Sequence, residues 1–506
     1  MDDKIILSKS KSGDFYINTK SFDVSTTKLN PFILKFFFLN DEVKITIGRI
    51  LDKISIYLGI LSIRDTTYTV LKEMIINSVK ANSKRIFFKE READIQNNQD
   101  YEKNISEFKK DFLENQEKYN TLLKKYDYYV LILFRFNKEM FQIKVKNNVS
   151  ITDEELKRIN QRIEKSKQYS DMSEIFMDQA DETEGAGLGL SMSLLMLKNE
   201  GISPDNYTII HSEKDTTTTI NIPLKFHKKN PSFQKTQDII SNLDTLPTFP
   251  KTITKIQELI SDSNANLEKI SALVESDVSL AANILKIANS AAFAQQNHAQ
   301  SIERAIQLIG FRELSNILFS VGTKRIMEDK YPAFEEIWKN ANKSAFICKL
   351  LANRMGFKNN FTTNLISASL LHDIGMVVIL SLEPELTNQI KKIIGEREIP
   401  ALLSMEEISI GTTHTIIGLM IAEKWNFPET LKIAVQYHHT PLMVNEKYHS
   451  LIFPVYLANK IIDIINLESQ YSYIHTQVLE YFDFTDEKIF MKFVNQIKKE
   501  YAQEMF

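Results

Sequence analysis

The chain has 506 residues, a formal net charge of −3, 43% hydrophobic residues and 25% charged residues. This length predicts about three domains. The composition is that of an ordinary globular protein rather than a general binder of nucleic acids or anionic membranes. The single cysteine, Cys348, excludes an intrachain disulfide, and the N-terminus lacks the apolar core of a signal peptide. We therefore expect a cytoplasmic protein that binds no nucleic acid and does not span a membrane.

The first 64 residues predict a β-hairpin followed by a helix. Apolar and polar residues alternate over residues 1–40 around Ser12-Gly13-Asp14, which indicates a hairpin. Residues 41–62 place apolar side chains at helical spacing. We expect residues 1–64 to form a separate N-terminal segment.

Residues 66–82 predict a second helix with a polar face. Glu73, Asn77 and Lys80 are four and three residues apart, so their side chains share that face. Three later segments are predicted as strands: 128–136, 140–145 and 207–223.

A glycine-rich loop, with Gly185, Gly187 and Gly189, precedes another predicted helix. Glycine lets a backbone come close to a phosphate, and a helix N-terminus favours anions. Together with the polar helix, this loop resembles the ATP-binding domain shared by histidine kinases, gyrase and related chaperones (GHKL). The resemblance implies an α/β two-layer sandwich over residues 65–225.

The GHKL resemblance also implies roles for the residues that carry it. Asn77 would hold Mg²⁺, with Lys80 beside it, the glycine loop would close over the phosphates of ATP, and Glu73 would be the general base of an ATPase. Residues 146–151 lack the acid and the glycines that bind adenine in that family. The loss of such a charge-assisted hydrogen bond costs about 1.5–3 kcal/mol. Two interpretations stay open: a domain that binds Mg-ATP, and a sandwich kept as an interaction domain.

A histidine kinase needs a phospho-acceptor histidine before its ATPase domain. The first histidine of this chain is His211, near the end of the predicted sandwich. Self-phosphorylation on an upstream histidine is therefore excluded.

Residues 89–127 form a polar insertion with a heptad-like seam. At 1.5 Å per residue, the seam predicts a helix about 39 Å long. It is either a coiled-coil helix for self-association or partner binding, or a helix packed on its own domain. The seam residues recur at intervals of four and three: Tyr101, Ile105, Phe108, Phe112, Asn115, Tyr119, Leu122 and Tyr126.

The rest of the chain is predicted to be helical after a linker over residues 226–242. Apolar residues recur at helical spacing from residue 252 onward. We expect one all-α domain over residues 243–465 and a C-terminal helical extension over residues 466–506.

His372 and Asp373 lie side by side inside an apolar run, Leu370 to Leu380. Burying these two side chains is costly unless a partner or a metal ion satisfies them. Three more histidines follow and complete a candidate set of metal ligands: His414, His438 and His439.

A His-Asp doublet followed by separated histidines resembles the HD superfamily of metal-dependent phosphohydrolases. The flanking segments resemble an HDOD domain, a signalling relative of that fold, over roughly residues 240–465. These segments are LDTLPTFPKTITKI from residue 243, SDVSLAANILKIANSAAF from 276, SIERAIQLIGFREL from 301 and HTIIGLMIAEKWNFPETLKIAVQYHHTP from 414.

The HD resemblance implies two further ligands, a first histidine and a last aspartate. The chain has Asn340 and Asn459 at those two positions. Three interpretations of the histidines stay open: internal pairs without metal, a single structural metal ion, and a working phosphohydrolase.

We therefore expect a non-catalytic cytoplasmic signalling protein. Its HDOD domain would recruit signalling proteins, and its degenerate ATPase-like domain would either sense a nucleotide or form a homodimer. The alternative is an enzyme, either a metal-dependent phosphohydrolase at His372 and Asp373 or an Mg-ATPase at the glycine loop.

Overall fold

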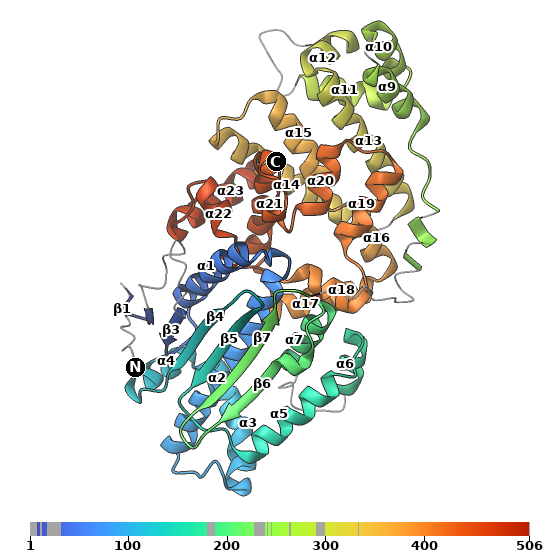
Figure 1. The fold of residues 1–506 in the computed structure, drawn as a ribbon. Coiled ribbons are helices and arrows are strands. Elements are labelled where there is room, and N and C mark those ends of the chain that lie inside the picture. The colour runs from blue at the N-terminus through green and yellow to red at the C-terminus, as the bar shows by residue number, and fades with distance from the viewer. Residues whose placement is uncertain are drawn as a thin grey trace. The chain divides into compact units, whose positions relative to one another are not determined.

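The computed structural model describes residues 8–10, 13–17, 32–179, 188–226, 238–239, 241–243, 245–262, 265–289, 299–331 and 333–504 (Figure 1). The chain divides into two compact units, Met1–Pro231 and Ser232–Phe506, called unit 1 and unit 2 below. Unit 1 combines a β-sheet with helices, and unit 2 is helical.

Unit 1 is built on an antiparallel sheet with the strand order β1-β2-β3-β4-β5-β7-β6. Buried residues alternate with less buried ones along β5, so one face of the sheet is the core face. Helix α2 packs against β4 and β5 and also contacts α1 and α7 (Figure 1). The strands are β1 Ser8–Lys9, β2 Phe15–Ile17, β3 Phe32–Phe36, β4 Val130–Phe136, β5 Met140–Asn147, β6 Tyr207–His211 and β7 Thr216–Pro223. The helices are α1 Asp41–Leu58, α2 Arg64–Glu90, α3 Asn98–Glu114, α4 Gln116–Lys125, α5 Asp153–Ser166, α6 Met172–Gln179 and α7 Leu188–Asn199.

The described residues within 1–64 belong to unit 1 and do not form the separate segment that the sequence predicts. The expected hairpin is present as β1 and β2, but β3 pairs with β4 in the central sheet, with Phe32 opposite Phe134. The expected helix is α1, and its buried face includes Val43, Ile47 and Leu51. Burial of this apolar surface makes the segment an integral part of unit 1.

The prediction of a single long helix for the insertion is wrong, because the helix is interrupted at Asn115 and forms α3 and α4. Asn115 leaves the helical conformation, and its side-chain amide donates to Asp111 Oδ1 at 2.8 Å. Phe108, Phe112 and Tyr119 are buried, and their rings contact one another. The seam therefore packs within unit 1, as the second interpretation expected.

Unit 2 consists of helices that pack around α14, α15, α16 and α21. Its first helices are α9 Lys251–Ser261, α10 Leu267–Glu275, α11 Val278–Ala288, α12 Ile302–Ile309 and α13 Phe311–Lys330. The central ones are α14 Phe334–Arg354, α15 Asn359–Leu371, α16 Ile374–Leu382, α17 Pro384–Arg397 and α18 Leu402–Ile410. The last ones are α19 His414–Lys424, α20 Glu429–Tyr437, α21 His449–Ile465, α22 Thr476–Tyr481 and α23 Glu487–Glu504.

One stretch of the described residues, Phe361–Leu382, has the length and the mean hydropathy, 2.0, that a membrane-spanning helix needs. The stretch covers most of α15, the His-Asp doublet and α16, and 72% of its apolar window is buried inside the protein. Such burial is typical of a core helix, which passes the same test of length and composition.

Candidate metal centre

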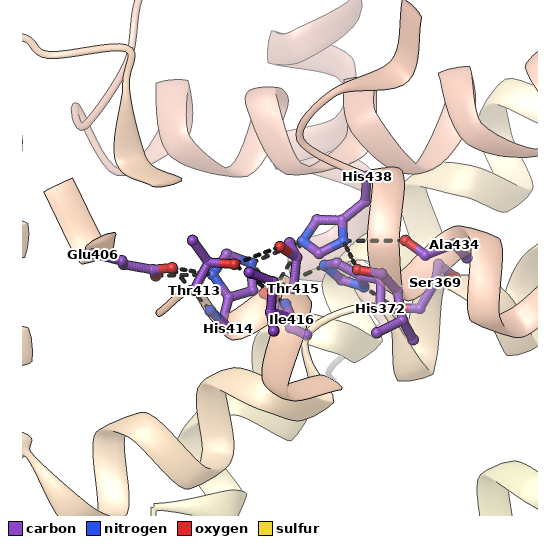
Figure 2. A network of polar contacts seen from close by, with 11 residues as sticks. Ser369, His372, Glu406, Thr413, His414, Thr415, Ile416, Ala434 and His438 are labelled. Carbon is purple, nitrogen blue, oxygen red and sulfur yellow. Dashed lines mark hydrogen bonds and ion pairs between the residues drawn. The ribbon is translucent and has the colours of Figure 1, made fainter. Parts of the chain in front are cut away.

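The His-Asp cluster, defined here as His372, Asp373, His414, His438 and His439, lies where four helices begin or end. His372 follows α15, Asp373 precedes α16, His414 opens α19, and His438 follows α20. Figure 2 shows three of the imidazoles turned toward one another from these helix ends. The structure therefore brings together all five residues that the sequence predicts for this site.

Two glycines allow α16 and α19 to cross at backbone contact. A Cβ atom on Gly375 would lie 1.9 Å from the carbonyl oxygen of His414, and one on Gly418 would lie 3.3 Å from the backbone nitrogen of Gly375 and 2.6 Å from Val435 Cγ1 on α20. Any larger residue would push the helices apart. This crossing holds His414 against Asp373.

The Nδ1 atoms of His372 and His438 are fixed by backbone carbonyl groups. Nδ1 of His372 lies 2.6 Å from the oxygen of Ser369, and Nδ1 of His438 lies 3.1 Å from that of Ala434 (Figure 2). Because a carbonyl oxygen only accepts, each Nδ1 carries the hydrogen, and in a neutral ring Nε2 keeps its lone pair. Burial lowers the pKa of His438 to about 4, so its ring is neutral at pH 7.

Glu406, on α18, holds the third imidazole. Nδ1 of His414 lies 2.8 Å from both Glu406 oxygens, and the backbone N–H of His414 donates to Glu406 Oε2 at 2.9 Å. Burial alone would lower the pKa of His414, but the charge and the hydrogen bond of Glu406 outweigh it and raise that pKa. A carboxylate behind an imidazole is also the usual support of a metal-bound histidine.

The Asp373 carboxylate is the point at which the three imidazoles meet. Its Oδ1 lies 3.2 Å from Nε2 of His438 and 3.4 Å from Nε2 of His414, and its Oδ2 lies 3.3 Å from Nε2 of His372. The Nε2 atoms of His414 and His438 are 3.1 Å apart. Asp373 Oδ1 and His372 Nε2 are buried and have no hydrogen-bond partner. Such a convergence of lone pairs requires either a shared proton or a cation.

These residues fit one divalent cation. One ligand atom from each of Asp373, His414, His438 and His439 lies within 4.8 Å of the others. Three imidazoles and a carboxylate suit zinc, iron or manganese. A bound ion would join the ends of α16, α19 and α20.

The positions expected for two more ligands hold amides. Asn340 and Asn459 line a cavity of about 240 Å³ next to His372, Asp373 and His439. A neutral amide does not replace the charge of a carboxylate or the basicity of an imidazole.

Three polar residues at this site were missed by the sequence analysis: Glu406, Lys460 and Asp463. Lys460 and Asp463 line the same cavity, with Lys460 Nζ 3.7 Å from Asp463 Oδ2, and burial raises the pKa of Asp463 to about 6. Glu406 had a signal, since an acid inside the apolar segment LLSMEEISI needs a partner once it is buried.

The described residues of unit 1 bring together only part of the predicted site. Asn77 and Lys80 line a cavity of about 420 Å³. Glu73 packs against Gly189 instead, where a Cβ atom would lie 2.1 Å from its carboxylate oxygen, and it is not among the described residues that line the cavity. Gly185 and Gly187 lie outside the described residues.

Comparisons with known proteins support the prediction of an HDOD domain in unit 2. Residues 246–441 match the HDOD domain family. An uncharacterized protein of Treponema pallidum is 30% identical over 458 residues, which cover 90% of this chain and 89% of that protein. An HDOD domain protein from Geobacter sulfurreducens is 24% identical, with a TM-score of 0.41, over 53% of this chain and 94% of its own. A candidate phosphohydrolase from Shewanella amazonensis is 21% identical, with a TM-score of 0.38, over 52% and 93%. The chain therefore belongs to the family of the Treponema pallidum protein, and its residues 246–441 form an HDOD domain.

Proposed function

We propose that this protein is a non-catalytic signalling protein of the cytoplasm. Its HDOD domain recruits signalling proteins, and unit 1 serves as a ligand-sensing or dimer-forming domain derived from a nucleotide-binding fold. The observation that carries the proposal is the pair Asn340 and Asn459 beside an otherwise complete His-Asp cluster.

Phosphate-ester hydrolysis with two metals needs ions about 3.5–4 Å apart, each with its own protein ligands. The ligand atoms within 4.8 Å of one another serve a single ion. The adjoining cavity offers Asn340 and Asn459, and its nearby carboxylate, Asp463, is already close to Lys460. In this proposal the cluster joins helices, with one ion or with a shared proton, and does not activate water.

A hydrolysis assay tests this proposal. We expect the wild-type protein to leave bis-p-nitrophenyl phosphate and cyclic dinucleotides intact with added manganese, iron or zinc. The double variant Asn340→His with Asn459→Asp restores the two missing donors and serves as the comparison. Wild-type turnover that Asp373→Ala abolishes would sink the proposal and favour a metal-dependent phosphohydrolase.

A second candidate function is Mg-ATP binding or hydrolysis by unit 1. It is favoured by Asn77 and Lys80, which lie four and seven residues after Glu73 as the GHKL resemblance requires and line one cavity. If it holds, calorimetry detects Mg-ATP binding that Asn77→Ala abolishes, and Glu73→Ala removes any turnover. Equal background rates in wild type and Glu73→Ala would exclude the ATPase.

A further inference from the structure

The cavity of about 420 Å³ in unit 1 has walls that the nucleotide hypothesis does not explain. Its volume lies in the range of small-molecule sites. One wall is α3, which contributes Tyr101, Ile105, Phe108 and Phe112. These residues form the first half of the heptad-like seam. The periodic pattern that suggested a coiled coil therefore lines a cavity.

A second set of lining residues is basic. Lys80 and Lys84 are one turn apart on α2, and Arg158 and Arg162 are one turn apart on α5, so each pair occupies one helix face. Lys109 on α3 is a fifth basic side chain at the cavity. Cations beside aromatic walls attract an anion with an apolar body.

The only carboxylate among the described lining residues is Glu155, and its oxygens are engaged by other groups. Lys84 Nζ lies 2.5 Å from its Oε1, and Arg85 Nη2 lies 2.9 Å from its Oε2. Its Oε2 also accepts from the backbone N–H of Thr152 at 3.0 Å. Burial alone would raise the pKa of Glu155, but these two cations outweigh it and hold it below the ordinary value. This acid is therefore poorly placed to accept a hydrogen bond from an amino group such as that of adenine.

We infer that this cavity binds a flat aromatic anion other than an adenine nucleotide. The aromatic body packs against Phe108 and Phe112, and the anionic group lies near Lys80 and Arg162. The inference rests on the proposed role of unit 1 as a ligand-sensing domain and names the class of ligand that it senses.

The test is a fluorescence titration of the full chain with two matched probes. 1-Anilinonaphthalene-8-sulfonate is the aromatic anion, and N-phenyl-1-naphthylamine is the same body without the sulfonate. Because a charge-assisted contact contributes about tenfold in affinity, we expect the anion to bind at least about tenfold more tightly than the neutral probe. Lys80→Gln and Arg162→Gln should each remove most of that difference and leave the neutral probe unaffected.

Two controls place the probe in the cavity. Lys157→Gln, an exposed position on α5 that does not line this cavity, should bind both probes like the wild type. Ile105→Trp, which fills the cavity with an apolar side chain, should abolish binding of both probes. Equal affinity for the two probes, or binding that survives Ile105→Trp, would overturn the inference.

Competition with Mg-ATP separates this inference from the nucleotide alternative. We expect no displacement of the anionic probe by Mg-ATP at millimolar concentration. Displacement that Asn77→Ala prevents would overturn the inference in favour of an adenine nucleotide. The probe titration does not report on the His-Asp cluster. If the probes do not bind as expected, the proposal of a non-catalytic HDOD domain still stands. Phosphodiester hydrolysis by the wild type would refute that proposal and would leave the inference about the cavity untouched.

Discussion

The His-Asp cluster of unit 2 and the cavity of unit 1 use polar side chains in opposite ways. In the cluster, buried imidazoles are fixed through Nδ1 and converge on one carboxylate. In the cavity, Phe108 and Phe112 are buried while Asn77, Lys80 and Arg158 are exposed. Buried polar groups cost stability when a partner is lost, whereas exposed ones cost little. Substitutions should therefore affect folding in the cluster and ligand binding in the cavity.

A substitution at the crossing of α16 and α19 should have the largest effect on stability. We expect Gly375→Ala to destabilise unit 2 by about 3 kcal/mol or more, because its new methyl group meets the backbone oxygen of His414. Both tryptophans, Trp338 and Trp425, lie in unit 2, so urea unfolding followed by tryptophan fluorescence reports its stability.

Gly395→Ala is the matched control for this crossing. Gly395 lies in α17, and nothing lies within 4 Å of a Cβ atom built there. Alanine should stabilise this helix by about 0.5–1 kcal/mol. Equal stability changes at Gly375 and Gly395 would show that the close crossing of α16 and α19 is not formed.

Loss of the ion pair between Glu406 and His414 should have the next largest effect on stability. Glu406→Gln removes a buried charge-assisted hydrogen bond and should cost about 1.5–3 kcal/mol, measured in protein freed of metal by a chelator. Glu423→Gln, an exposed change on α19, should be close to neutral.

The cost of Glu406→Gln should also depend on pH. Because the pKa of His414 is raised in the folded protein, the stability from this pair is fully present below the unfolded pKa of about 6.5. It is lost as the pH rises through the higher folded pKa. A difference between wild type and variant that grows with pH would contradict this assignment.

The smallest effect is expected at the rim of the cavity. Arg162→Gln should change the stability of unit 1 by no more than about 0.5 kcal/mol, because the side chain is only half-buried and lines an open cavity. Differential scanning calorimetry measures this change. A loss of several kcal/mol of stability would mean that Arg162 is needed for folding of unit 1, as the cluster is for unit 2.

The sequence was sufficient to find the His-Asp doublet because its chemistry is local. His372 and Asp373 are adjacent and lie in an apolar run, and burial of such a pair demands a partner. Glu406 and the crossing of Gly375 with Gly418 were not predictable in this way. Each depends on which helices meet, and periodicity within one helix carries no information about that.

In unit 1, two predictions were wrong for the same reason, since the sequence pattern does not show which elements meet. The seam from Tyr101 to Tyr126 kept its apolar spacing, but spacing alone did not reveal the helix break at Asn115. Residues 1–64 looked separate because the pairing of β3 with β4 joins segments about a hundred residues apart. Asn77 and Lys80 line one cavity because they share one helix face, and their role in binding a nucleotide stays a prediction.

The central claim is that the cluster holds at most one ion and performs no hydrolysis. Its most direct test is elemental mass spectrometry on full-length protein purified without chelators, with Asp373→Ala as the reference. We predict no more than one atom of zinc, iron or manganese per chain, absent from Asp373→Ala. Two metal atoms per wild-type chain would mean that Asn340 and Asn459 do not prevent a second site, and would contradict the account.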